Sequence, residues 1–339
     1  MEITPLPSRV ILLRAEDPSQ TGAARRQAVF LASTLEFDEI RQGQLGIIVT
    51  EAARNIELHA GEGEIVLVPW RFGDTAGIDV LALDRGKGIA DIARCMEDGF
   101  STAGTAGNGL GAMLRQADIF QIYSAASTGT AVFMRVYRIS PDANIVASRY
   151  PFGVVSLPIL GESRCGDAWS AIHEKGRSIY IVADGLGHGP AAAEAAEEAI
   201  RIFHQTAQRT PAQILEEIHG ALAKTRGAAV SIAEVSRENQ VVNYAGVGNI
   251  ASMIFFGGKS RSLVSMTGIA GHVAPKIQQF SYPCEPNSTL IMHSDGLATR
   301  WNIEQYPGLS SKHPALIAAV LFRDHTRRRD DVTVLVSRM

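Results

Sequence analysis

The sequence has little that would fit it to a membrane, an oxidising compartment or a nucleic acid. Its three cysteines, in 339 residues, are far apart, so neither a disulfide framework nor a CxxC motif is present. No apolar run reaches the roughly 18 residues that a membrane-spanning helix needs. The N-terminus lacks a basic stretch followed by an apolar one, so we expect no signal peptide. A net charge of −3 gives no electrostatic case for nucleic acid or an anionic membrane. These absences predict a cytoplasmic chain without either partner.

The length predicts two domains, and the composition predicts that both are folded. At roughly 150 residues per domain, the chain is long enough for two hydrophobic cores. A hydrophobic fraction of 46% with 20% charged residues is typical of globular proteins and excludes general disorder. A turn-prone cluster at 140–144 predicts the boundary, which gives domains over 8–139 and 145–339. The first domain alternates predicted helices and strands, whereas the second has more strands than helices and favours stacked sheets flanked by helices.

Three polar residues in the first domain share one face of a predicted helix over 37–60. Glu51, Asn55 and His59 follow one another at four-residue spacing, which places them along one stripe of the helix. A solvated surface stripe has the same pattern, so the helix alone leaves both interpretations open. His59 we interpret as a structural histidine.

Glycine-rich segments after a buried strand favour a nucleotide site. Asp84 ends an apolar predicted strand, and Gly86 and Gly88 follow it directly. The sequence at 107–111, GNGLG, then opens a helix. Glycines let backbone amides approach an anion, and a helix N-terminus adds partial positive charge, so such a turn suits phosphate. Neither the P-loop pattern nor the Rossmann glycine pattern occurs, which excludes those two nucleotide folds.

The ordered motifs of residues 8–139 resemble the GHKL ATPase fold that histidine kinases share with bacterial anti-sigma serine kinases, in particular the RsbT type. The matching segments are EAARN at 51–55, DRGKGI at 84–89, DGFST at 98–102, GNGLG at 107–111 and GT at 129–130. The resemblance implies an α/β sandwich that binds ATP with Mg²⁺. It also implies a protein serine kinase.

This resemblance assigns roles to individual side chains. It makes Glu51 the general base that takes the proton from a protein serine, and Asn55 the side chain that holds Mg²⁺ on the ATP phosphates. It makes Asp84, assisted by Thr130, the acceptor for the adenine amino group. The glycines that would let the chain pass the base and close over the phosphates are Gly86, Gly88, Gly107, Gly109 and Gly111.

Four acidic residues of the second domain lie at predicted strand ends beside small or flexible residues. They are Asp167, Asp184, Asp295 and Asp330. Any one of them fits an ordinary turn, since Asp-Gly pairs are common in turns. Carboxylates that converge from strand ends repel one another, however, and a divalent cation with oxygen ligands is the usual resolution. Together they indicate a metal site.

This half resembles the metal-dependent PPM protein phosphatases, in their SpoIIE and RsbX branch. The matching segments are GESRCGD at 161–167, DGLGHG at 184–189, TRGAA at 225–229, SDGL at 294–297 and DDVTV at 330–334. The resemblance implies an αββα sandwich and a pair of Mn²⁺ or Mg²⁺ ions. It implies that Asp184 bridges the ions and that the other ligands are Asp167, Asp295, Asp330 and the carbonyl of Gly185.

The implied chemistry is hydrolysis of phosphoserine or phosphothreonine, with Asp184 and Asp295 counted among the catalytic residues. A metal-held water becomes a hydroxide near neutral pH and attacks phosphorus directly. Asp331 we interpret as a residue that supports the ligands. His188 has two interpretations, a proton donor to the leaving serine or a packing residue of its turn.

The sequence therefore predicts an α+β two-domain chain with opposed activities, a serine kinase and a phosphoserine phosphatase. The resemblance implies a STAS-domain antagonist or a stressosome-like scaffold as partner, and possible control of a sigma-factor regulator. A second hypothesis keeps the phosphatase and makes the first domain a nucleotide-gated protein-binding module. A third, an unrelated metabolic α/β enzyme, predicts no phosphoserine hydrolysis.

Overall fold

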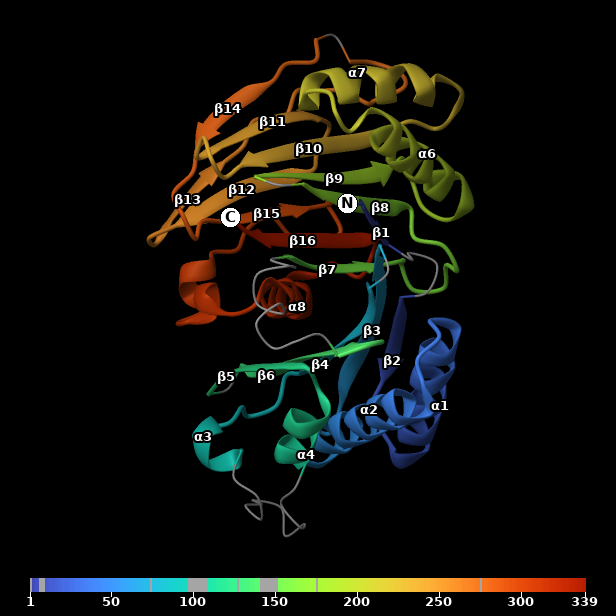
Figure 1. Cartoon of the computed structure of the whole chain (residues 1–339), viewed down its shortest axis with the longest axis vertical. Helices are drawn as coiled ribbons and strands as arrows, with labels where there is room; N and C mark the ends of the chain where they lie inside the picture. The colour runs from blue at the N-terminus through green and yellow to red at the C-terminus, as the bar shows by residue number, and fades with distance from the viewer. Residues whose placement is uncertain are drawn as a thin grey trace. The chain divides into compact units, whose positions relative to one another are not determined.

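The chain divides into two compact units in the computed structural model (Figure 1). The structure describes residues 2–5, 10–73, 75–96, 109–126, 128–140, 152–174, 176–274 and 276–339. One unit comprises Arg9–Tyr150, and the other comprises Pro151–Met339 together with Met1–Ser8. Within the described ranges, no helix has the length and apolar character needed to span a membrane.

The Arg9–Tyr150 unit is a two-layer α/β sandwich. Its sheet runs in the order β2-β3-β4-β6-β5, with every neighbouring pair antiparallel. The strands are β2 (Ile11–Arg14), β3 (Gly63–Phe72), β4 (Thr75–Asp84), β5 (Ile119–Ala125) and β6 (Gly129–Tyr137). The helices are α1 (Pro18–Thr34), α2 (Glu39–Ala60), α3 (Ile92–Cys95) and α4 (Gly109–Gln116). Helix α2 packs on β3, β4 and β6, and α1 and α4 pack on α2.

Helix α2 presents the candidate catalytic stripe at the border of the core. It begins after Asp38, whose carboxylate accepts a hydrogen bond from the Arg41 amide at 2.7 Å. It ends at Gly61, whose φ of 79° suits glycine at a helix C-terminus. Its sheet-facing side is buried, whereas Glu51 and Asn55 are half-buried beside that side. The local signals therefore fix both the helix and the side of it that carries the polar stripe.

A buried ion pair joins β4 to β6. The Arg135 guanidinium donates to both carboxylate oxygens of Asp79 at 2.6 and 2.7 Å, and the Trp70 indole donates to Asp79 at 3.0 Å. Burial by itself would lower the pKa of Arg135, but the adjacent Asp79 carboxylate outweighs it and the pKa is raised. The charge is therefore kept inside the sheet by its partner.

Breaking this pair is expected to destabilise the unit. Asp79→Ala leaves a buried guanidinium without its partner, and we expect a loss of about 3 to 5 kcal/mol in the free energy of unfolding. The matched control is Glu16→Ala, which breaks the exposed Arg14–Glu16 pair at 3.1 Å and should cost less than about 1 kcal/mol. Chemical denaturation checks both variants. Equal losses would contradict the prediction.

The other unit is an αββα sandwich of two antiparallel sheets. The first sheet has the order β14-β11-β10-β9-β8-β1 and the second β13-β12-β15-β16-β7. The strands are β1 (Glu2–Pro5), β7 (Phe152–Leu157), β8 (Asp167–Glu174), β9 (Arg177–Gly185), β10 (Ala228–Ser236), β11 (Val241–Val247), β12 (Ala251–Phe256), β13 (Lys259–Ser262), β14 (Phe280–Pro283), β15 (Thr289–His293) and β16 (Val332–Arg338). The α-helices are α6 (Pro190–Thr206), α7 (Pro211–Ala221) and α8 (Pro314–His325), with short 3₁₀ helices at Leu222–Lys224, Ile303–Gln305 and Leu309–Ser311.

The helices of this unit cover the two outer faces of the sandwich. Helices α6 and α7 pack on the first sheet, and α8 packs on β7 and β16 of the second (Figure 1). Ala- and Ile-rich faces of α6 and α7 form a core with β8, β9 and β10. This arrangement confirms the αββα architecture that the sequence predicts. In this unit the candidate metal residues lie at the start of β8, near the end of β9, just after β15 and just before β16.

Strand β1 comes from the start of the chain and yet pairs with β8 of this unit. Its backbone is antiparallel to β8, with Glu2 opposite Ile172 and Ile3 opposite Ala171. The first residues therefore extend the first sheet, although the Arg9–Tyr150 unit follows them directly in the sequence. No local signal predicts this pairing, because strand pairing is a long-range interaction.

Candidate active sites

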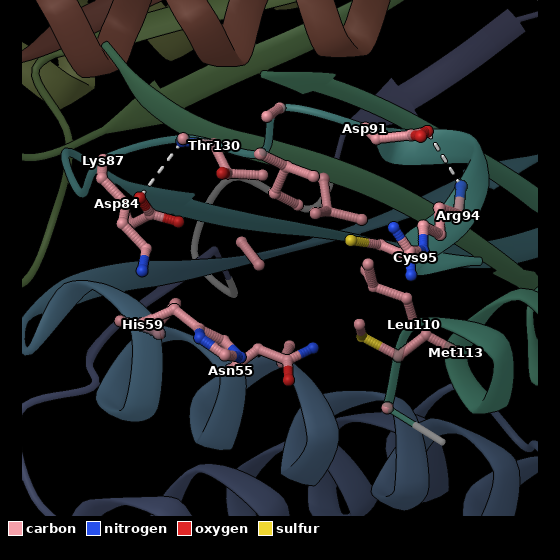
Figure 2. A pocket seen from close by; sticks show the side chains of 18 of the residues that line it. Asn55, His59, Asp84, Lys87, Asp91, Arg94, Cys95, Leu110, Met113 and Thr130 are labelled. Atoms are coloured by element: carbon pink, nitrogen blue, oxygen red, sulfur yellow. Dashed lines mark hydrogen bonds between the residues drawn. The ribbon is translucent and has the colours of Figure 1, made fainter. Parts of the chain in front are cut away.

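A cavity of about 500 Å³ lies in the first unit between α2 and the sheet. Figure 2 shows Asn55 and His59 of α2 on one side of it and Asp84 and Thr130 of the sheet on the other. Gly88, Gly109, Lys87 and the hydrophobic side chains of Leu110 and Met113 complete much of the wall. Polar groups at fixed points of an otherwise apolar cavity are typical of a small-molecule site.

Asp84 is held in place by the backbone around it. Its Oδ1 accepts hydrogen bonds from the amides of Gly86 at 2.8 Å and Thr130 at 3.1 Å, the second of which is drawn in Figure 2. The Ser124 hydroxyl, which sequence reasoning missed, lies 3.0 Å from the Thr130 hydroxyl and accepts from the Ile89 amide at 2.8 Å. Together these bonds fix the loop after β4 against β5 and β6.

The glycines of that loop are required by close contacts. Gly88 has a φ of 76°, and a Cβ there would lie 2.3 Å from the Ala125 carbonyl oxygen. At Gly86 a Cβ would approach the Cβ of Ala60 to 2.9 Å. The loop therefore passes too close to its neighbours for any larger residue.

Glu51 and Asn55 meet the start of α4. A Cβ at Gly109 would lie 3.0 Å from the Asn55 amide oxygen and 3.3 Å from a Glu51 carboxylate oxygen. Gly111 is buried in α4. Among the described residues, those that line the cavity do not include Glu51, Gly86 or Gly111. Gly107 and the segment 98–102, also expected to form the site, lie outside the described residues.

In the second unit, the candidate carboxylates lie at strand ends of both sheets. Asp167, the first residue of β8, is directly opposite Asp184 near the end of β9. Asp295 follows β15, and Asp330 precedes β16, in the other sheet. The Ser294 hydroxyl joins the two sheets, because it donates to Asp167 Oδ2 at 2.6 Å. Residues more than a hundred positions apart thus meet in one place.

The carboxylates perturb one another. Burial raises the pKa of Asp184 well above its ordinary value, and the charges of Asp167, Asp295, Asp330 and Asp331 raise it further. Burial also raises the pKa of Asp167; a hydrogen bond from Ser294 opposes this, and the charge of Asp331 reinforces it. Such mutual effects require that the acidic groups lie near one another. Holding all of them ionised requires positive charge from elsewhere.

The donor set fits a hard divalent cation. Asp167 Oδ1 and Asp331 Oδ2 are buried and have no hydrogen-bond partner among the described residues. Unpaired buried carboxylate oxygens are costly, and oxygen ligands of this kind suit Mg²⁺ or Mn²⁺. Across all the residues that the structure describes, no three Asp, Glu, His or Cys side chains form a group arranged to hold an ion. The fit therefore rests on the unpaired oxygens and the donor chemistry.

Gly185 and Asp331 support this region through the backbone. A Cβ at Gly185 would lie 2.0 Å from the Ala192 carbonyl oxygen, so only glycine fits against α6. Asp331 Oδ1 accepts from the Ile159 amide at 2.8 Å, which ties the loop before Asp167 to the start of β16. That contact agrees with a supporting role for Asp331, although its other oxygen is unpaired.

Two further side chains of the site were assigned no role from the sequence. The Asn249 amide donates to Asp295 Oδ2 at 2.8 Å and so orients that carboxylate. Glu162 lies 2.8 Å from the exposed imidazole of His188, measured from Oε1 to Nδ1. The only local signal at Asn249 is a Gly-Asn turn after an apolar strand, and that signal is common to many turns.

The folds and sites define a two-module chain in which a nucleotide-binding type of α/β sandwich is joined to an αββα sandwich of the PPM phosphatase type. Residues 174–339 match the family model of Stage II sporulation protein E (SpoIIE). The chain is 39% identical over 110 residues to the serine/threonine-protein kinase RsbT of Bacillus subtilis (strain 168). The aligned region covers 32% of this chain and 83% of that protein. It is 27% identical over 189 residues to the phosphoserine phosphatase RsbX of the same organism. That aligned region covers 55% of this chain and 93% of RsbX.

One solved structure, from work on the bacterial stressosome as a modular system adapted to control secondary messenger signaling, has 28% sequence identity and a TM-score of 0.52. The aligned region covers 56% of this chain and 98% of the chain in that structure. The chain therefore belongs to the RsbT family of serine/threonine kinases through its N-terminal region, fused to a C-terminal PPM phosphatase homologue of the RsbX and SpoIIE type.

Proposed function

We propose that this chain sets the phosphorylation state of a partner protein from both directions. The C-terminal half hydrolyses phosphoserine or phosphothreonine on the partner with a water activated by two Mn²⁺ or Mg²⁺ ions. The N-terminal half binds ATP with Mg²⁺ and phosphorylates a partner serine. The observation that carries the phosphatase part is the group of acidic side chains at the ends of both sheets, where Asp167 lies opposite Asp184 and is bonded by Ser294 of the other sheet.

In the phosphatase half, the chain's own residues hold charge and geometry. Asp167, Asp184, Asp295 and Asp330, with the Gly185 carbonyl, would hold the two ions, which supply a hydroxide near neutral pH when bound. Ser294 fixes the orientation of Asp167, and Asn249 fixes that of Asp295. Glu162 orients His188 so that its ring is available to the leaving serine oxygen.

Removal of the metal tests this half. The wild-type protein is expected to release phosphate from a phosphoserine peptide with Mn²⁺ or Mg²⁺ and to lose at least about a hundredfold of that rate in excess EDTA, because the hydroxide then has no source. Added Mn²⁺ should restore the rate. Release that is unchanged in EDTA would contradict a metal-activated water.

In the N-terminal half, the cavity supplies groups for each part of a nucleotide. Asp84 and Thr130 would bind the adenine, and Asn55 would hold Mg²⁺ at the phosphates beside the start of α4. The glycines of the loops, Gly107 among them, would let the backbone follow the ligand. Glu51 lies beside Asn55 at Gly109, where a carboxylate could take the proton of an incoming serine.

Enlarging Gly88 is expected to disrupt nucleotide binding. Gly88→Ala forces a Cβ against the Ala125 carbonyl at an unfavourable φ, so the loop after β4 must move. We expect at least a tenfold weaker ATP affinity by calorimetry, with the phosphatase rate unchanged. The control is Gly43→Ala in α2, where a Cβ meets nothing within 4 Å and should preserve ATP affinity. Equal affinities for both variants would contradict the assignment of this loop.

The relatives suggest the class of partner. RsbT and a stressosome structure are among the matches, and a STAS-domain antagonist or stressosome-like scaffold fits both halves of the proposal. Control of a sigma-factor regulator would follow from such a partner. Pull-down with the phosphatase-dead Asp184→Asn variant, followed by phosphosite mapping, identifies the protein. A capture without any phosphoserine site would contradict this part.

One observation favours a second function for the N-terminal half. Within the described residues, Glu51 borders the nucleotide cavity but is not among the residues that line it. A half that binds ATP and a partner without transferring phosphate would need the cavity and not the base. A measurement of label transfer from ATP to the partner distinguishes the two functions.

A further inference from the structure

The charge balance of the phosphatase site calls for cationic side chains. Five acidic residues lie in it, namely Asp167, Asp184, Asp295, Asp330 and Asp331. Two divalent ions would leave this group slightly negative if every carboxylate is ionised. A phosphoserine brings a further charge of roughly −1.5 to −2 near neutral pH. Without cations of its own, the site would repel its substrate.

Arg226 is a cation on the turn that adjoins the loop of Asp184. The turn precedes β10, whose Ala228 is opposite Gly185 in the sheet, and the Leu186 amide donates to the Gly227 carbonyl at 3.0 Å. Arg226 Nη1 lies 3.2 Å from the position that a Cβ would occupy at Gly187. The bare backbone of the loop therefore leaves room for the guanidinium.

The turn that carries Arg226 is internally braced. The Thr225 hydroxyl donates to the Leu222 carbonyl at 2.8 Å and accepts from the Gly227 amide at 3.0 Å. The Arg226 side chain is exposed, and among the described residues it makes no ion pair or hydrogen bond. A charged side chain on a rigid turn, without a partner, is suited to an anionic ligand.

Arg327 is a comparable cation on the segment between α8 and β16 of the other sheet. It lies just before Asp330, and its amide donates to the Gly296 carbonyl at 2.8 Å, beside Asp295. Its side chain is exposed. Burial raises the pKa of Asp295, and the charge of Arg327 opposes that shift, although the described residues show no hydrogen bond between the two side chains. Arg164, in the segment before β8, differs because it forms an ion pair with Glu197 at 2.6 Å.

We propose that Arg226 and Arg327 bind the phosphoryl oxygens of the phosphoserine substrate, one from each sheet of the sandwich. The inference rests on the proposed phosphatase function and adds the groups that recognise the phosphate. A guanidinium presents paired N–H donors that match two phosphate oxygens, whereas an ammonium acts as a point charge. The chemistry recognised is thus a dianionic phosphomonoester.

The experiment compares Arg226→Gln and Arg327→Gln with the control Arg261→Gln, an exposed arginine on β13. With a phosphoserine peptide and saturating Mn²⁺, each test variant should raise KM at least tenfold and change kcat less than threefold. The inhibition constant of inorganic phosphate should weaken by a similar factor. Arg226→Lys should recover part of the loss. Mn²⁺ affinity, measured by calorimetry, should stay within twofold of wild type for Arg226→Gln.

Three results would overturn the inference while the proposed function stands. The first is a KM and a phosphate inhibition constant in both test variants that match those of the Arg261→Gln control. The second is a loss of activity confined to kcat. The third is a loss of activity that follows weakened Mn²⁺ binding in both test variants. A wild-type protein that releases no phosphate with any divalent ion would instead overturn the proposed function, and this inference with it.

Discussion

Asp184→Asn is expected to abolish phosphoserine hydrolysis and, at the same time, to raise the melting temperature of the metal-free protein. The variant removes a carboxylate that we propose as a metal ligand, and without the metal-activated hydroxide the rate should fall by a factor of about a thousand or more. It also removes the repulsion that Asp184 suffers from four neighbouring carboxylates. Relief of a few kcal/mol in a unit of this size corresponds to roughly 5 °C or more.

The stability effect has a defined pH dependence. A carboxyl whose folded pKa is raised binds its proton more tightly in the folded than in the unfolded state, so stability falls as pH rises from its ordinary value through the raised value. The advantage of Asp184→Asn in EDTA should therefore be larger at pH 8 than at pH 5. Added Mn²⁺ should stabilise the wild type much more than the variant.

The control for Asp184→Asn is Glu238→Gln, which removes an exposed carboxylate from the turn between β10 and β11. It should alter neither hydrolysis nor the response to Mn²⁺. Calorimetric melting with and without EDTA, together with phosphate release, decides the outcome. An Asp184→Asn protein that hydrolyses the peptide at the wild-type rate, or melts lower than wild type in EDTA, would show that Asp184 does not face the other carboxylates.

Glu51→Gln is expected to remove phosphate transfer from ATP to the partner while ATP binding persists. Glu51, on α2, lies beside Asn55 and faces the start of α4, and we propose that it is the base for the transfer, whereas the cavity proposed for the nucleotide is not lined by it. General-base loss typically costs a factor of about 100 to 10,000. The transfer is measured with labelled ATP and a STAS-domain partner, in the Asp184→Asn background so that label is not removed.

The matched control is Glu57→Gln, a carboxylate on the same helix that does not line the cavity. It should transfer label at the rate of the Asp184→Asn parent. ATP affinity should be equal in all three proteins. If the Asp184→Asn parent itself transfers no label to a partner that it binds, the N-terminal half is a nucleotide-gated binding module and the kinase proposal fails.

Secondary structure could be predicted wherever the signal was local. The helix expected over 37–60 is α2 (Glu39–Ala60), because its caps and apolar spacing lie within the helix itself. The apolar strand expected to end at Asp84 is β4 (Thr75–Asp84). Helix α8 (Pro314–His325) gave no such signal, because ten of its twelve residues are buried and a helix that is apolar all round shows no amphipathic period.

Supporting roles for Ser294 and Asn249 could not be predicted, because each residue acts on a partner far away in the sequence. Ser294 contacts Asp167 across 127 positions, and Asn249 contacts Asp295 across 46. Serine and asparagine in turns are ordinary, so nothing in their immediate neighbourhood distinguishes these two. Only the packing of one sheet on the other identifies them.

By itself, the sequence determined the types of the two modules and the order in which they follow one another, and it indicated the side chains that we propose for the chemistry, since strand-end carboxylates and glycine-rich turns are local properties. Only the tertiary structure decided that Asp167 and Asp184 stand opposite each other, that burial and mutual repulsion raise their pKa values, and that β1 joins the sheet of the second unit. Those outcomes depend on free energies of long-range pairing and desolvation, which arise only when distant segments are brought together.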